Sequence, residues 1–192
     1  MPHTFPKTHR LYRAAEEFEA AAAAWQVMGK IGVRPIKELE DAWSLFLMHT
    51  ERLWNKLLAA GRGLSGWQHI ESEVNQLRKT DPLLCYVHHA RNATEHTIQE
   101  FAADWNGPLK VEPTHDGATI SWPPWDRPLL PVVDRGQTYP PPTEHLGSSI
   151  TEKFGKGLPQ SYVVGEVALR FYFKALNRAA RDVRWVSDRA DA

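Results

Sequence analysis

Four neighbouring residues of different chemistry stand at helical spacing near the middle of the chain. Arg91, Asn92, Glu95 and His96 offer a guanidinium, an amide, a carboxylate and an imidazole, and His88 precedes them by one turn. A histidine exchanges protons near neutral pH, and a guanidinium holds oxyanions through paired hydrogen bonds. Such a cluster could therefore move a proton beside a bound anion.

The helix that carries this cluster is predicted to span residues 81–106. Asp81 can accept the first free amide hydrogens, and Pro82 suits the first helical position. A largely apolar stripe then recurs every three or four residues, at Leu83, Val87, Ala90, Thr94, Ile98, Phe101 and Trp105. The opposite face is polar and holds His88, Arg91, Asn92, Glu95, His96 and Gln99. We expect the apolar stripe to face a core and the polar face to stay open.

Further helices are predicted on both sides of this one. Apolar periodicity, with glycine or proline at the ends, predicts helices over residues 11–29, 35–61, 65–80 and 161–189. The first two are joined by a short connection and should pack as an antiparallel pair. The expected fold is mainly α: a single domain over residues 1–192, built as a bundle of about five helices.

An insertion interrupts the bundle before its last helix, at residues 107–160. Nine of the fourteen prolines fall between Pro108 and Pro142, so a long helix or a central strand does not fit there. Alternating residues at 109–112 and 118–122 flank Asp116-Gly117 and predict a β-hairpin. Large apolar residues between the other prolines predict a strap that lies on the bundle.

Composition places the chain among ordinary globular proteins. Charged residues make up 24% and apolar residues 42%, and the formal net charge is zero, which argues against a strongly basic nucleic-acid-coating protein. The lone cysteine, Cys85, cannot form an internal disulfide. The chain begins without an apolar leader, and no stretch approaches the roughly 20 apolar residues of a membrane span. We therefore expect a soluble, cytoplasmic protein without a membrane partner.

The arginine, its polar neighbour and the histidine form a known pattern. In this chain it reads Arg91-Asn92, with His96 after four intervening residues, and it lies on the fourth predicted helix of a small bundle. It resembles the signature of the HEPN (higher eukaryote and prokaryote nucleotide-binding) superfamily. The resemblance covers roughly residues 11–106 and the last helix.

The resemblance implies a metal-independent endoribonuclease that works as a homodimer, with both motifs facing a shared cleft, often as a toxin or antiviral defence effector. It implies proton transfer by His96, contact of Arg91 with the scissile phosphate, and orientation of one of them by Asn92. From their place on the same polar face, we expect Glu95 and His88 to support the motif. The resemblance implies RNA as substrate, an antitoxin or nucleotidyltransferase as a possible partner, and neither metal nor cofactor. In one toxin branch a tyrosine modified by such a transferase lies two positions after the histidine, where this chain has Ile98.

Other interpretations of the motif stay open. The polar face could be solvated or form a salt-bridge network, in which case the bundle would be a non-catalytic dimeric module that binds a nucleotide, RNA or a protein. Glu95 could orient His96 or bind Arg91 one turn back. His88 and His89 together with Glu95 and His96 could bind zinc or iron, although His-x3-His spacing is absent.

Two further patterns bear on the function. The family pattern allows four to six residues between arginine and histidine, so Arg62 and His69, with six, also fit it, but the glycines between them should break the helix. Arg170, Lys174, Arg178 and Arg181 recur at helical spacing on the last helix. They could follow an RNA backbone or form a solvated face near a helix C-terminus.

Overall fold

The computed structural model describes residues 5–30, 36–96, 110–114, 117–121, 129–150 and 160–190. For residue 30, residues 95–96, both strands of the first hairpin and residues 182–190 it describes the backbone alone. No helix in these ranges is long and apolar enough to cross a membrane.

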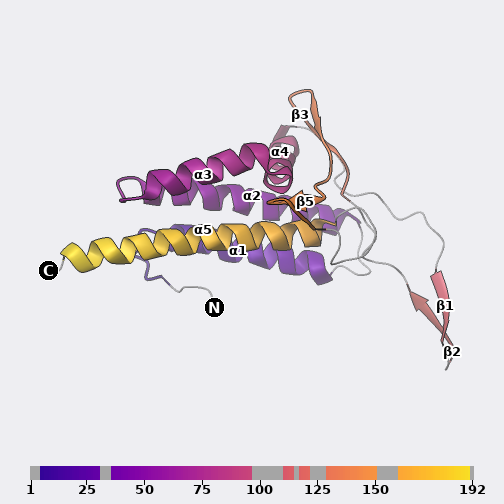
Figure 1. Cartoon of the computed structure of the whole chain (residues 1–192). Coiled ribbons are helices and arrows are strands. Elements are labelled where there is room, and N and C mark those ends of the chain that lie inside the picture. Colours follow the sequence, from indigo (N-terminus) through magenta and orange to yellow (C-terminus); the bar gives the residue numbers. More distant parts are fainter. Residues whose placement is uncertain are drawn as a thin grey trace.

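Five helices make up the described part of the bundle (Figure 1). They are α1 (Tyr12–Lys30), α2 (Ile36–Gly61), α3 (Trp67–Thr80), α4 (Pro82–His96) and α5 (Ser161–Ala190). The prediction of a mainly helical fold is confirmed, and the helix starts agree with the predicted ones to within two residues. Residues 97–106, the predicted second half of the fourth helix, lie outside the described residues.

The helices bury the apolar stripes that the sequence predicts. Helix α1 packs against α2 and α5, and α4 packs against α2 and α3. Trp43, Phe46, Trp54 and Leu83 are among the large side chains that are fully buried between them. Each such residue contributes about 2–3 kcal/mol of hydrophobic free energy. This shared core holds α4 in place.

The first and last helices meet through an aromatic pair. The ring of Trp25 in α1 stacks on Tyr162 in α5, with centroids 4.9 Å apart and planes 12° apart. The Trp25 indole also donates a hydrogen bond to the backbone carbonyl of Tyr162, at 3.0 Å. Two sequence-distant ends of the chain therefore close the bundle.

The residues described between α4 and α5 form three two-stranded antiparallel sheets. They are β1 (Lys110–Thr114) with β2 (Gly117–Ser121), β3 (Val132–Asp134) with β4 (Gln137–Tyr139), and β5 (Glu144–His145) with β6 (Ser148–Ser149). The predicted hairpin over residues 109–122 corresponds to β1 and β2, which pair from Lys110↔Ser121 to Thr114↔Gly117. Its turn residues 115–116 lie outside the described residues.

The other two hairpins turn through left-handed backbone conformations. Arg135 and Gly136 have φ values of 51° and 79°, and Leu146 and Gly147 have 50° and 73°. Two consecutive positive φ values are typical of type I′ turns, which match the twist of paired strands. These turns let residues 132–149 fold back twice within a short length.

The segment of residues 129–150 covers α4 and changes its environment. Leu129, Val132 and Ile150 join the buried core, and the Tyr86 hydroxyl donates a hydrogen bond to the Leu130 carbonyl, at 2.8 Å. Tyr86 is buried, although the sequence pattern placed it off the apolar stripe. Helix α4 is therefore covered on two sides, and its polar face is less open than predicted.

One aspartate fastens this segment to the start of α4. The Asp81 carboxylate accepts a hydrogen bond from the Leu84 amide at 3.0 Å, which confirms it as the helix cap. The same carboxylate accepts hydrogen bonds from His145 Nδ1, at 3.0 Å, and from the Leu146 amide, at 2.7 Å. Asp81 thus links the β5–β6 hairpin to α4.

Candidate functional site

Two residues of the motif lie in contact on α4. The Arg91 guanidinium donates a hydrogen bond from Nη1 to Oδ1 of Asn92, at 3.2 Å. The amide of Asn92 in turn donates to Oδ2 of Asp134, at 3.1 Å. Both motif side chains are half-buried. The guanidinium is therefore oriented by a neighbour that is itself held by the β3–β4 hairpin.

Arg91 also borders an open pocket of about 430 Å³ between α4 and α2. Its walls come from Asp41, Ser44, Leu45, Leu47, Met48, Arg91 and Thr94. Leu45 is exposed at this pocket. Asp41 and Arg91 are the two charged residues of this lining.

His96 and Glu95 stand in the last described turn of α4. Their side chains lie outside the described part, so the proton-transfer and supporting roles stay predictions. Along an ideal helix, position 96 follows Asn92 by about one turn and lies about 140° around the axis from Arg91. The helix backbone therefore presents positions 92 and 96 on one face.

His88, predicted to support the motif, belongs to a different cluster. Its Nδ1 lies 2.7 Å from Nη2 of Arg78 and 3.6 Å from a carboxylate oxygen of Glu51. Arg78 also forms an ion pair with Glu51. Burial alone would raise the pKa of Glu51, but the neighbouring His88 ring and the charge of Arg78 bring it below its ordinary value. The cluster ties α2, α3 and α4 together.

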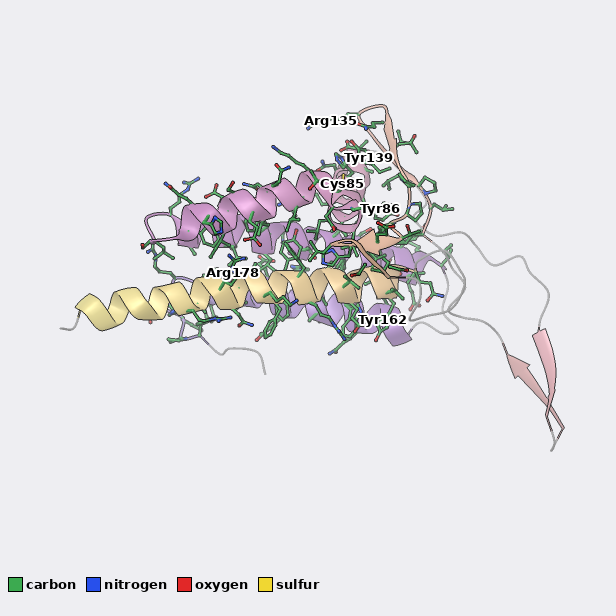
Figure 2. The ribbon with its side chains drawn as sticks, viewed as in Figure 1. Cys85, Tyr86, Arg135, Tyr139, Tyr162 and Arg178 are labelled. Atoms are coloured by element: carbon green, nitrogen blue, oxygen red, sulfur yellow. The ribbon has the colours of Figure 1, made fainter. Side chains whose placement is uncertain are left out.

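His89 faces the motif side instead. Its Nδ1 lies 2.8 Å from Oδ2 of Asp134, the same oxygen that accepts from Asn92. The ring stacks on Tyr139, with centroids 3.6 Å apart and planes 10° apart. Figure 2 shows Tyr139 on the hairpin that lies against α4, with Arg135 at its turn.

The Asp134 carboxylate is the buried centre of this arrangement. Its side chain is only 4% exposed. Burial alone would raise the pKa of Asp134, but hydrogen bonds from His89 and Asn92 hold it below the ordinary aspartate value. Asp134 is therefore ionised at neutral pH and accepts both bonds. Sequence reasoning missed it because it stands 45 residues from His89 and no spacing rule links them.

The basic residues of α5 border a second and larger pocket. A groove of about 820 Å³ runs between α3, α5 and the β5–β6 hairpin, with Arg170, Lys174 and Arg178 along one wall. Its lining also includes apolar residues of each element, among them Val74, Ile150 and Phe171. Arg181, also predicted to contact RNA, is exposed one turn further along α5. The groove thus collects three of the four predicted RNA-binding residues.

Two of these cations already have carboxylate partners. Arg178 pairs with Glu73 across the groove, at 2.9 Å, and Figure 2 shows Arg178 between α3 and α5. Arg170 pairs with Glu166 one turn back on α5. Both pairs are solvent-exposed and therefore weak. Lys174 has no ion-pair partner among the residues whose side chains are described.

Among the described side chains, no three histidine, cysteine, aspartate or glutamate residues gather closely enough to hold a metal ion. Comparisons with protein-family models, curated proteins and solved structures find no match to this chain.

Proposed function

We propose that the chain is a metal-independent endoribonuclease of HEPN type that cleaves RNA at the α4 motif. Arg91 holds the scissile phosphate, Asn92 orients the guanidinium, and His96 transfers a proton. The observation that carries the proposal is the Arg91 guanidinium, which is hydrogen-bonded to Asn92, while Asn92 is in turn held by Asp134. A preorganised cation of this kind can stabilise charge that develops on a phosphate in the transition state.

The proposal includes a homodimer that brings two motifs together and a cytoplasmic site of action, in a toxin or antiviral defence system with an antitoxin or nucleotidyltransferase as possible partner. Leu45, exposed at the edge of the Arg91 pocket, offers a second copy an apolar contact next to the motif. Light scattering on the purified protein measures this directly. A monomer at all concentrations would remove the shared cleft from the proposal.

The activity is tested with purified protein, a fluorescent single-stranded RNA and excess EDTA. We expect cleavage in EDTA, and a loss of roughly 10²–10³-fold in Arg91→Ala, the range for one lost charge-stabilising donor. Arg62→Ala is the matched control, because Arg62 and His69 also fit the motif, with six intervening residues, but do not lie on one helix. Gly63 and Gly66, with φ values of 82° and 77°, separate α2 from α3 there. Cleavage that requires a divalent metal, or equal activity of the two variants, would contradict the proposal.

A second candidate function rests on the groove next to α5. Its size of about 820 Å³, its apolar lining and the row of Arg170, Lys174 and Arg178 suit a non-catalytic module that binds RNA, a nucleotide or a protein segment. Saturable binding of a labelled oligouridylate without any cleavage, unaffected by His96→Ala, would favour this function over the nuclease.

A further inference from the structure

The geometry points to His89, oriented by Asp134 from the insertion, as the general base of the proposed cleavage reaction, with His96 as the acid. This inference rests on the proposed nuclease function and deepens it, because it assigns a second proton-transfer group and gives the β3–β4 hairpin a part in catalysis. It is argued from the hydrogen bonds around Asp134, the ring contacts of His89 and the positions of these residues along α4.

The hydrogen bond to Asp134 decides which nitrogen of His89 carries the proton. Asp134 is an ionised, buried carboxylate and can only accept, so the His89 Nδ1 at 2.8 Å must be the donor. In the neutral ring the other nitrogen, Nε2, then has a free lone pair. The buried carboxylate also stabilises the imidazolium that forms when Nε2 takes up a proton. His89 is thus held in the tautomer that a base requires.

Packing fixes the plane of the ring as well. Tyr139 lies flat on one face at 3.6 Å between centroids, and His88 meets the ring edge-on at 5.1 Å. The His89 side chain keeps 21% of its surface exposed. A solvent-reachable imidazole with a fixed tautomer and a fixed plane is prepared for proton transfer before any substrate binds.

The positions along α4 place two histidines on either side of the phosphate-binding residues. Positions 89, 92 and 96 share one face of the helix, and the outer two are about 10 Å apart along its axis. The backbone of Arg91 starts on the far side of the cylinder, but its guanidinium reaches the Asn92 amide. A phosphate held by the Nη1 edge of the guanidinium, beside Asn92 and outside the pocket that faces α2, would therefore lie over the helix face that carries positions 89 and 96.

The reaction balances with these two groups and no further reagent. Nε2 of His89 takes the proton of the ribose 2′-hydroxyl while the 2′-oxygen bonds to phosphorus. The bond from phosphorus to the 5′-oxygen breaks, and His96 gives its proton to that oxygen. The products are a 2′,3′-cyclic phosphate and a 5′-hydroxyl end, and both histidines return to their starting states by proton exchange with water.

The roles are tested with two RNA substrates that differ only at the leaving atom. One is an ordinary oligoribonucleotide, and the other has a bridging 5′-sulfur at the cleavage site, which leaves as a thiolate without needing a proton. His89→Gln keeps a donor for Asp134 but has no titratable nitrogen. We expect it to lose roughly 10²–10⁴-fold in cleavage rate on both substrates. His96→Ala should lose a similar factor on the ordinary substrate and regain most of it on the sulfur substrate.

Asp134→Asn tests the positioning role through the pH dependence of kcat/KM. The acidic limb of the wild-type profile should move in Asp134→Asn and vanish in His89→Gln. Thr138→Ala, an exposed change on the same hairpin, is the control and should keep the wild-type profile. Thermal unfolding followed by circular dichroism checks that each variant is folded. If Asp134→Asn does not fold, the kinetics of His89→Gln alone decide whether His89 is the base.

The outcomes separate this inference from the function on which it rests. A wild-type protein that does not cleave RNA in EDTA overturns the nuclease function and the inference together. A wild-type protein that cleaves, combined with a folded His89→Gln that keeps activity within about threefold of it, overturns the inference alone. Recovery of His89→Gln on the sulfur substrate would also overturn it, because that pattern belongs to an acid.

Discussion

Replacement of Asp81 should loosen the β5–β6 hairpin and the start of α4 together. Its carboxylate is 2% exposed and accepts three hydrogen bonds, from the Leu84 and Leu146 amides and from His145 Nδ1. In Asp81→Ala all three donors lose their acceptor. The side chain is too deeply buried for solvent to screen or replace these bonds without a structural shift.

The size of the effect follows from the separate contributions. Loss of a helix cap costs about 1 kcal/mol, and each hydrogen bond to a buried charge contributes about 1.5–3 kcal/mol. The sum is about 4–7 kcal/mol, but His145 and Leu146 belong to a surface hairpin that can shift and expose its donors to water. We therefore expect a loss of about 3 kcal/mol in unfolding free energy, or about 6–12 °C in Tm.

Asp81→Asn isolates the charge from the cap. Asparagine can still cap α4 through its oxygen, but its amide then faces the Leu146 amide, and two donors meet. We expect it to lose about 2 kcal/mol at neutral pH. Glu144→Ala, an exposed change on the same hairpin, should cost less than about 0.5 kcal/mol.

The pH dependence gives the prediction its sign. Burial alone would raise the pKa of Asp81, but the His145, Leu146 and Leu84 hydrogen bonds hold it below the ordinary value of 3.8. A lowered pKa means that the carboxylate stabilises the fold above the unfolded-state pKa and stops doing so as the pH falls through the folded-state pKa. Urea unfolding at a series of pH values should show the difference between wild type and Asp81→Asn shrinking in acid. A difference that is absent at neutral pH, or that persists unchanged in acid, would refute the reasoning.

Three further predictions concern the core and the groove. Arg78→Met should lower the unfolding free energy by about 3 kcal/mol in urea titrations, because it leaves the carboxylate of Glu51 buried without its cation. Gly61→Ala should cost about 1–3 kcal/mol, since the added methyl group would overlap the buried indole of Trp67. Lys174→Ala should reduce the slope of log binding constant against log salt concentration for a labelled oligouridylate by about 0.7, the value for one lost contact with a single strand.

Each of these predictions has a counterpart that should behave differently. The double variant of Arg78→Met with Glu51→Gln should cost less than the two single changes added together, because they share one ion pair. Gly63→Ala meets no neighbouring atom, so only its φ of 82° opposes it, at about 1 kcal/mol. Lys56→Ala on α2 should leave the salt slope unchanged. A double variant that costs as much as the two single changes together would argue against the Arg78–Glu51 ion pair. Equal effects of the two glycine variants, or of the two lysine variants, would argue against the Trp67 overlap or the Lys174 contact.

The helical part of the fold could be predicted because its rules are local. Apolar residues at three- and four-residue steps locate α2, and Leu39, Trp43 and Phe46 are buried as that spacing requires. Asp81 and Pro82 marked the start of α4 by capping chemistry alone. Such signals lie within a few residues of each other, so a single sequence contains them.

The insertion was harder to predict because its turns break the usual residue preferences. Arg135 and Leu146 adopt positive φ values, where asparagine or glycine is the ordinary choice. The prolines on either side then favoured an extended strap in place of two more hairpins. The segment does lie on the bundle, but its sheet pairing was beyond the local pattern.

The candidate site was predicted in part for the same reason. Arg91 and Asn92 are adjacent in sequence, and the structure joins them. Asp134 reaches them only through the folded insertion. His88 and His89 belong to different clusters because His88 contacts Arg78 and His89 contacts Asp134. Groups that meet across 42 or 45 residues leave no mark in periodicity or spacing.

The Trp25–Tyr162 contact also has a consequence for synthesis on the ribosome. Its two residues are 137 positions apart, so at 5–20 residues per second roughly 7–27 s pass between the translation of one and of the other. During that interval α1 and α2 exist without the helix that later covers Trp25, and their apolar surfaces are open to other nascent chains. We expect newly made copies to depend on a chaperone, or to aggregate when translation halts before α5 emerges.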